Sequence, residues 1–405
     1  MEFSKKLMEL SDQADEELAP VFRRIDKISF ANTGKVLDAF IRNRVSVSHF
    51  DMTTGYGYDD KGRDTLDKIY AEVFGAEAAF VRHSILSGTH ALTIGLFGLL
   101  RPGDVMLSIT GKPYDTLDEV IGLSGNPGDG SLRDFGVEYR ECALGEDFMP
   151  LLSDPKIKVV YIQRSKGYMN RKTLSASEIN GMIDKIRSKT AAFIVVDNCY
   201  GEFVDETEPK GDLVIGSLIK NPGGGIAECG GYIAGSKRAV ELASYRYSCA
   251  GIGLEGGASM GHTKNMYKGL FMAPHIVAQA EKTAIFAAYI FEKLGYDVEP
   301  LCTDERHDII QTVKLYSPEK LCAFCKGIQA ASPVDSYVSP EPWDMPGYSD
   351  QVIMAAGAFT QGSSIELSAD GPMREPYTVF FQGGMTFEAG KTGILSAAQA
   401  VLDLG

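Results

Sequence analysis

The spacing of apolar residues changes along the chain and separates its first two stretches. In residues 1 to about 45 apolar positions recur at helical spacing, as at Leu7, Ala14 and Phe22, with charged residues between them. This spacing predicts amphipathic helices that lie against another part of the protein. Residues from about 46 to 64 lose this periodicity and are rich in Gly, Tyr and Asp, which predicts a loop.

From about residue 65 to 270, short apolar runs alternate with helical segments. Val159 to Ile162 and Phe193 to Val196 are rich in β-branched residues and apolar on both faces, and Ser175 to Lys189 between them has helical spacing. Apolar strands separated by helices indicate an α/β fold with a mainly parallel sheet covered on both sides. Ligands of such sheets bind beyond the carboxyl ends of the strands, so Asp197 is expected at the functional edge.

A third stretch begins near residue 271 with a long helical pattern from Ala273 to Leu294. Short mixed elements follow, with several prolines between Ser332 and Pro346. This pattern predicts a smaller α+β domain. The expected division is an N-terminal helical arm and interface loop (1–64), a large domain (65–270) and a C-terminal small domain (271–405).

Composition and charge narrow the choice of partners. The 405 residues are 44% hydrophobic and 23% charged, and 54 Asp and Glu outnumber 40 Lys and Arg, which gives a formal net charge of −14. Nucleic acids and anionic membranes require clustered Lys and Arg, so a small-molecule substrate is favoured over both. The first residues lack an apolar signal core, and no window reaches the roughly 20 apolar residues of a membrane span, which predicts a cytoplasmic protein.

The seven cysteines are odd in number and scattered, which favours a reducing compartment over a disulfide framework. Cys322 and Cys325 form the single CxxC motif. Because no second pair or histidine cluster accompanies them, two thiols on a helix of the C-terminal domain are favoured over a zinc or redox site. No bound metal is expected.

Three separated motifs carry groups that one cofactor would need. Ser87, Gly88 and Thr89 open a helical run, where unpaired N–H groups and the helix dipole favour an anion. Asp197 offers a carboxylate, and Lys220 offers an amine before a glycine-rich turn. Alone, each has an ordinary explanation as an N-cap, a strand-end carboxylate or a solvated lysine. Their joint occurrence favours pyridoxal phosphate (PLP), which needs an amine for a Schiff base, a carboxylate beside its ring nitrogen and amides for its phosphate.

These motifs give the chain a resemblance to a known family. The runs Gly55 to Asp60, Ser87 to Ala91, Val196 to Gly201 and Ser217 to Gly224 resemble those of fold-type-I PLP enzymes. Within that class the chain is similar to the cystathionine and methionine γ-lyase group and its aluminium-resistance branch. The resemblance implies a seven-stranded, mainly parallel sheet between helices. It also implies a carbon–sulfur lyase that converts cystathionine, methionine or cysteine by β- or γ-elimination into a 2-oxo acid, ammonia and a thiol.

The resemblance further implies roles for individual residues. Lys220 would form the Schiff base, Asp197 would keep the ring nitrogen protonated, and Tyr114 would stack on the ring and act as acid or base. Cys199 would pack on the opposite ring face as a small apolar group. The resemblance implies that the phosphate is held by Ser87, Gly88, Thr89 and Ser217, together with a neighbour's Tyr56, Tyr58 or Arg63. It also implies that Arg374 binds the substrate carboxylate.

The sequence leaves several alternatives open. The same residues would serve an aminotransferase or a γ-replacement synthase, and a non-catalytic metal-tolerance protein could keep the fold. Arg374 could form a surface ion pair with Glu375 or Asp370 instead of binding substrate. If the loop from Tyr56 to Arg63 completes a neighbour's site, the active unit is at least a homodimer, and the resemblance suggests a homotetramer.

Overall fold

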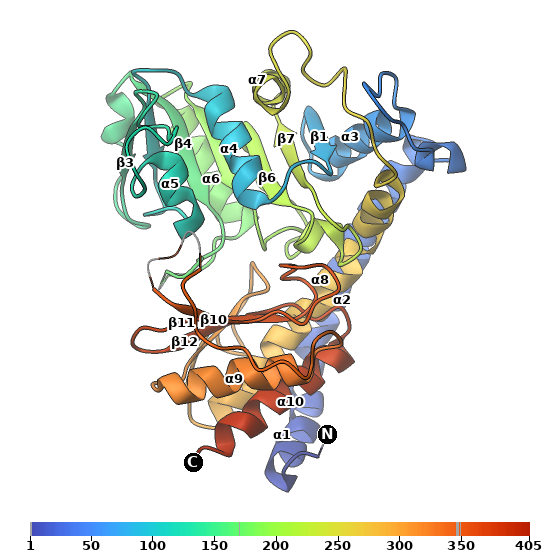
Figure 1. Cartoon of the computed structure of the whole chain (residues 1–405), viewed down its shortest axis with the longest axis vertical. Helices are drawn as coiled ribbons and strands as arrows, with labels where there is room; N and C mark the ends of the chain where they lie inside the picture. Colours follow the sequence, from blue (N-terminus) through green and yellow to red (C-terminus); the bar gives the residue numbers. More distant parts are fainter. Residues whose placement is uncertain (1, 170, 346–347, 349) are drawn as a thin grey trace.

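A computed structural model describes residues 2–169, 171–345, 348 and 350–405 of the chain. Figure 1 shows a larger body built on one sheet and a smaller body built on a second sheet, with the helices α2 and α8 running along both. Ser29 of α2 donates a hydrogen bond to the carbonyl of Pro274 in α8 (3.0 Å), which fixes the two helices side by side. The two bodies are therefore joined by helices as well as by loops.

The larger sheet has seven strands in the order β1-β7-β6-β5-β4-β2-β3. The strands from β3 to β6 in this order run parallel, whereas β7 is antiparallel to both β6 and β1. The mainly parallel seven-stranded sheet implied by the resemblance is thus confirmed. The strands are β1 (Ala78–Arg82), β2 (Val105–Ser108), β3 (Glu138–Glu141), β4 (Ile157–Gln163), β5 (Phe193–Asp197), β6 (Leu213–Ser217) and β7 (Gly231–Gly235).

Helices cover both faces of this sheet. Successive strand residues point to opposite sides, and apolar side chains on both sides are buried under these helices. Val160 and Val196 pack with α3 and α6, whereas Val159 and Val195 pack with α4 and α7. The predicted helix after Ser175 is confirmed as α6, which begins with a capping box between Ser175 and Glu178. The helices of this body are α3 (Lys61–Val73), α4 (Gly88–Leu99), α5 (Asp118–Ile121), α6 (Ala176–Arg187) and α7 (Lys237–Tyr247), with 3-10 turns Asp115–Leu117, Leu151–Ser153 and Asn221–Gly223.

The smaller body is an antiparallel sheet in the order β10-β11-β12-β9-β8, covered by helices. The predicted N-terminal amphipathic helices also belong here, because Leu7, Ala14 and Ile25 are buried in the same apolar cluster as Ile285 of α8. Its elements are α1 (Lys5–Glu17), α2 (Ala19–Arg42), α8 (Thr263–Lys293), β8 (Asp297–Glu299), β9 (Gln311–Lys314), α9 (Pro318–Ala330), β10 (Val352–Ala355), β11 (Ser368–Pro372), β12 (Thr378–Gln382) and α10 (Phe387–Leu402).

Two boundaries differ from the sequence prediction. The loop expected up to residue 64 contains a 3-10 turn, Val47–Phe50, and ends at Asp60, whose carboxylate caps α3 by accepting from the amide of Arg63 (2.9 Å). The expected domain boundary at residue 270 lies inside α8, which is continuous there. The division into three domains stays a prediction. In the described ranges, no helix is both long and apolar enough to cross a bilayer.

Candidate active site

Lys220 lies three residues beyond the end of β6 and opens the 3-10 turn Asn221–Gly223. Its side chain lines a cavity of about 310 Å³ between the two bodies, and its Nζ lies 4.1 Å from the centre of the Tyr200 ring. Burial lowers the pKa of Lys220, but nearby acidic groups, among them the carboxylate of Asp197, oppose this effect, and the pKa lies above its ordinary value. An amine thus faces the cavity at the carboxyl edge of the sheet, as predicted.

Asp197 ends β5, the strand next to β6, and lines the same cavity. Its two oxygens accept hydrogen bonds from the amide of Cys199 (3.1 Å) and from the hydroxyl of Tyr161 (3.2 Å). Burial and the charge of Asp197 raise the pKa of Cys199 well above its usual value, so this thiol stays neutral. A neutral buried thiol is suited to packing rather than to nucleophilic attack.

The N-terminus of α4 forms the wall of the cavity nearest to Lys220. Ser87 caps the helix by accepting from the amide of His90 (3.1 Å), and Thr89 shares a hydrogen bond with Thr116 (2.7 Å between the hydroxyl oxygens). A Cβ on Gly88 would lie 3.2 Å from the sulfur of Cys199 and 3.9 Å from Nζ of Lys220. Glycine therefore leaves the backbone open to a close ligand at this helix end.

Ser217, the last residue of β6, supports an anion site at the same place. Its side chain is fully buried, and its hydroxyl has no hydrogen-bond partner within the described part of the chain. A buried polar group without a partner is costly, so an acceptor is expected beside it. The phosphate of PLP satisfies this requirement and those of the helix end.

Tyr114 lines the same cavity as Lys220 and the start of α4. Its amide donates to the side chain of Gln163 (2.7 Å), and its hydroxyl lies 2.7 Å from that of Tyr348. Burial, together with the neighbouring Tyr168 and Tyr348, raises the pKa of Tyr114 well above its usual value. The phenol therefore carries its proton at neutral pH.

Glu202 is a fully buried acid behind Lys220. Oε1 of Glu202 accepts a hydrogen bond from the hydroxyl of Tyr232 (3.0 Å), and a Cβ on Gly216 would lie 2.3 Å from this oxygen. The backbone carbonyl of Glu202 accepts a hydrogen bond from the side chain of Asn221 (3.0 Å). Burial raises the pKa of Glu202 to about 8. The backbone of Glu202 thus supports the turn that carries Lys220, and its carboxyl group is mostly protonated at neutral pH.

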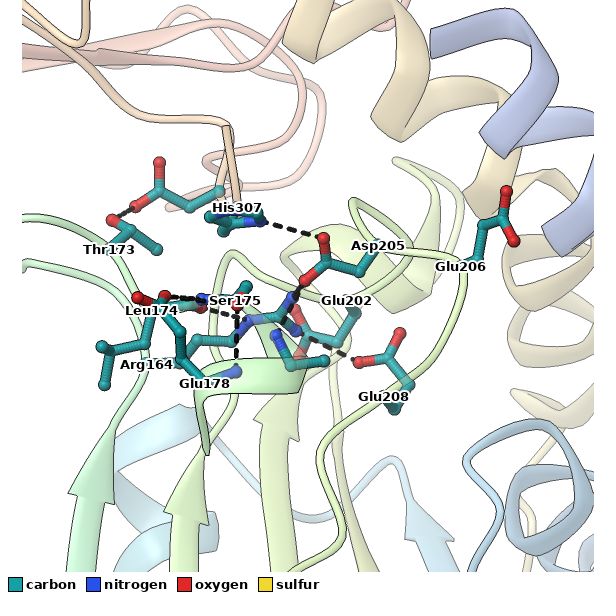
Figure 2. A network of polar contacts seen from close by, with 12 residues as sticks. Arg164, Thr173, Leu174, Ser175, Glu178, Glu202, Asp205, Glu206, Glu208 and His307 are labelled. Atoms are coloured by element: carbon teal, nitrogen blue, oxygen red, sulfur yellow. Dashed lines mark hydrogen bonds and ion pairs between the residues drawn. The ribbon is translucent and has the colours of Figure 1, made fainter. Parts of the chain in front are cut away.

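Arg164 anchors the loop that follows Asp197 (Figure 2). It directly follows β4, its side chain is fully buried, and it contacts Asp205 (2.6 Å), Glu208 (3.3 Å) and Asn198 (2.8 Å). His307 of the smaller body contacts the other oxygen of Asp205 (2.9 Å). One arginine therefore fixes the loop that presents Cys199 and Tyr200 to the cavity, and the same loop is tied to the smaller body.

The structure does not bring Arg374 to Lys220. The Arg374 guanidinium pairs with Asp350 (2.8 Å), its side chain is 46% exposed, and it borders a separate cavity of about 260 Å³. The surface ion pair considered as an alternative is therefore present, but with a different acid from the two expected. Arg374 lies two residues beyond the end of β11 and is not among the residues that line the cavity of Lys220.

The three residues expected to reach a neighbour's phosphate differ in their placement. Tyr56 and Tyr58 are 76% and 57% exposed and stack on each other with ring centres 5.5 Å apart, outside the cavity. Arg63 is buried, and its guanidinium donates to the carbonyls of Gly57 and Gly257 (both 2.7 Å). Arg63 therefore lies in the first turn of α3 and contacts its own chain, and the role implied for it at a neighbour's phosphate stays a prediction, as do those of Tyr56 and Tyr58.

The cavity also contains residues that the sequence did not indicate. Gln163 ends β4 and could have been found by the strand-end rule that found Asp197. Tyr348, Asp370 and Gln382 come from the smaller body, where no motif distinguishes them. At the start of α4, Nδ1 of His90 accepts a hydrogen bond from the amide of Leu86 (3.1 Å).

The seven-stranded sheet and the lysine beyond β6 define the fold-type-I class of PLP-dependent proteins. The solved PLP-dependent protein YhfS from Escherichia coli shares this fold, with a TM-score of 0.61 at 13% identity over 95% of this chain and 97% of its own. The family model described as methionine gamma-lyase matches residues 7–402, so the chain belongs to that family.

Two relatives are similar over almost the whole chain. The Bacillus subtilis (strain 168) protein YnbB is 50% identical over 400 residues, which cover 96% of this chain and 95% of the relative. A carbon-sulfur lyase involved in aluminum resistance from Clostridium novyi NT has a solved structure with a TM-score of 0.94. It is 48% identical and covers 98% of this chain and 96% of its own. The family and branch named from the sequence are thus confirmed.

Proposed function

We propose that the protein is a PLP-dependent carbon–sulfur lyase that releases a thiol, ammonia and a 2-oxo acid from a sulfur-containing amino acid. The observation that carries this proposal is the meeting of three groups in one cavity. The amine of Lys220, the carboxylate of Asp197 and the N-terminus of α4 all line it, together with the Ser217 hydroxyl, which has no hydrogen-bond partner among the described residues. These are the groups that bind an aldehyde, a pyridine nitrogen and a phosphate.

Each group has a defined place in such a site. Lys220 would hold the cofactor covalently, Asp197 would pair with the ring nitrogen, and Ser217, Gly88 and Thr89 would hold the phosphate. When bound, PLP supplies an electron sink that stabilises negative charge at Cα of the amino acid. Asp197 strengthens this effect, because its two existing hydrogen bonds fix its orientation at the end of β5.

The proton transfers would be made by Lys220 and Tyr114. The amine of Lys220, once released, removes the proton from Cα as a general base. Tyr114 lines the same cavity and carries its proton at neutral pH, and this proton would go to the departing thiolate. Cys199 would pack against the ring of the cofactor, and its own raised pKa keeps it from competing as a nucleophile.

Incubation of the purified holoenzyme with cystathionine, methionine and cysteine tests the proposal. Release of a thiol with an equal amount of 2-oxo acid is expected for at least one of them. Lys220→Ala should abolish this release and change the visible absorbance of bound PLP, because both depend on one amine. Amino transfer to a 2-oxo acid without thiol release would identify an aminotransferase and overturn the proposal, and so would the absence of both reactions.

We also propose that the active unit is a homodimer or homotetramer. Two aromatic side chains as exposed as Tyr56 and Tyr58 are unusual on a free surface and typical of subunit interfaces. Light scattering on the wild type and on a double Tyr56→Ser, Tyr58→Ser variant tests the assembly. A wild type that stays monomeric at micromolar concentration would contradict it.

A further inference from the structure

A second cavity, of about 650 Å³, lies between the two bodies. Its wall comes from the loop after β4 and the start of α6 in the larger body, and from residues between 299 and 308 in the smaller body. Figure 2 shows part of this wall, where His307 of the smaller body meets Asp205 of the larger one. Among the described residues, none lines both this cavity and that of Lys220. A ligand held here would therefore contact both bodies at a separate site.

Two buried cations lie close together in the wall of this cavity, one from each body. Lys166 lies three residues after β4 and is 2% exposed, and Arg306 lies five residues before β9 and is 3% exposed. Nζ of Lys166 donates to the carbonyl of Glu299 (3.3 Å), and Nη2 of Arg306 donates to the carbonyl of Pro300 (3.4 Å). Because these two carbonyls belong to consecutive residues, the two positive charges are held near each other and repel.

Neither cation has a close carboxylate partner. For Lys166, the one carboxylate oxygen found within 4.0 Å in the described ranges is Oε1 of Glu299, at 4.0 Å. For Arg306, no ion pair within that distance is found in the described part of the chain, and none of the residues outside it is an acid. Nε of Arg306 is buried and has no hydrogen-bond partner among the described residues. Two buried charges thus lack the partners that such charges require.

The buried acids near this pair do not remove the deficit. Asp308 is buried and acts on both cations, but both of its oxygens already accept hydrogen bonds. Burial raises the pKa of Glu281 to about 8, so that carboxyl is mostly protonated at neutral pH. Burial lowers the pKa of Lys166, and it lowers that of Arg306 to about 10, although Asp308 acts in the opposite direction on both. An anion in the cavity would relieve this loss of solvation.

The rest of the wall limits the charge of such an anion. Glu206, Asp304 and Glu305 are exposed acids that line the same cavity. They would repel a polyanion such as a nucleotide, whereas a single carboxylate can pair with the two cations and carries only one charge. We propose that Lys166 and Arg306 bind the carboxylate of a small organic acid between the two bodies. This proposal does not depend on the proposed function.

Calorimetry on the holoenzyme tests the binding, with acetate and pyruvate as probes, neither of which has an amino group that could react with PLP. In a buffer of low ionic strength, at least one probe should bind with a Kd of about 1 mM or lower. Lys166→Met should weaken this binding at least about tenfold, because it removes a charge-assisted hydrogen bond. Lys172→Met is the matched control. Lys172 lines the same cavity, but its side chain is 66% exposed and pairs with Glu178, so its loss should change Kd less than about twofold.

Thermal unfolding distinguishes a ligand site from a cation that only supports the fold. If Lys166 supported the fold, Lys166→Met would lower the unfolding midpoint of the ligand-free protein. We expect a midpoint equal to or above that of the wild type, because the variant no longer buries a poorly paired charge. At equal ionic strength, acetate should raise the midpoint of the wild type and of Lys172→Met, but not that of Lys166→Met.

Four results would overturn the proposal. The first is that neither probe binds. The second is an unchanged affinity in Lys166→Met, which would place the probe elsewhere, for example in the cavity of Lys220. The third is tighter binding of inorganic phosphate than of either carboxylate. The fourth is a lowered midpoint in ligand-free Lys166→Met, or its failure to fold, because the lysine would then be structural. None of these measurements requires turnover, so the lyase proposal is decided separately.

Discussion

Replacing Arg164 by Met should destabilise the protein strongly, although Arg164 does not line the cavity. Arg and Met side chains have similar length, so the substitution mainly removes the positive charge of Arg164, which pairs with both Asp205 and Glu208. Glu208 is almost fully buried, and removing one partner of a buried ion pair costs about 3–5 kcal/mol. We expect a loss of stability at the lower end of this range, because Glu208 keeps hydrogen bonds from the side chain of Asn198 (2.9 Å) and from the amide of Phe203 (2.8 Å).

Equilibrium urea unfolding followed by circular dichroism measures this loss. Arg238→Met is the matched control, since Arg238 is mostly exposed and pairs with Glu241 one helical turn away, where an ion pair contributes about 0–1 kcal/mol. Adding Glu208→Gln to Arg164→Met should recover part of the stability, because it removes the unpaired charge. The reasoning is refuted if Arg164→Met costs no more than Arg238→Met, or if the second substitution recovers nothing.

Three further predictions concern the site and its surroundings. Gly88→Ala should weaken PLP binding at least about tenfold in an absorbance titration, because the new methyl group meets the sulfur of Cys199; unchanged affinity would contradict a close ligand there. Glu202 binds a proton more tightly when folded, so wild-type stability should fall as the pH rises from about 5 to 8, and Glu202→Gln should reduce this fall. Burial also raises the pKa of Glu281 to about 8, so the variant should keep part of the pH dependence of stability. Identical pH profiles of stability for wild type and variant would contradict the assignment to Glu202. Arg374→Ala should leave kcat and KM within about twofold of the wild type, because an exposed ion pair outside the cavity is lost; a KM raised tenfold would restore Arg374 as a substrate ligand.

The sequence was sufficient for the parts of the site that are local along the chain. Asp197 could be placed because it ends an apolar strand, and Gly88 because it opens a helix after one. Both positions follow from the general rule that parallel strands present their carboxyl ends at one edge. The glycine-rich turn after Lys220 was not sufficient to identify this lysine as a site residue. Its identification depended on the other two motifs, those of Asp197 and Gly88.

The remaining parts of the site depend on packing that no local pattern encodes. Asp370 and Gln382 reach the cavity because the antiparallel strands β11 and β12 are placed against the larger sheet. Arg374 follows β11 in the same body but pairs with Asp350 outside this cavity, so its implied contact with the substrate carboxylate stays a prediction. For Arg63, the expected loop is in fact the first turn of α3, and its helical backbone turns the guanidinium towards Gly257.

The continuity of α8 limits how the chain can be divided into separately expressed fragments. Gly269 of this helix touches Gly223, and a Cβ on Gly269 would lie 2.3 Å from the Gly223 carbonyl oxygen. The helix therefore supports the turn that carries Lys220 from behind. A chain divided at residue 270 would cut this helix one residue after Gly269. The fragment with the lysine would then lose Ala273, whose backbone nitrogen would lie 3.1 Å from a Cβ on Gly224 at the end of the same turn. Fragment complementation or domain-swap experiments should instead place their junctions after Lys293, where α8 ends.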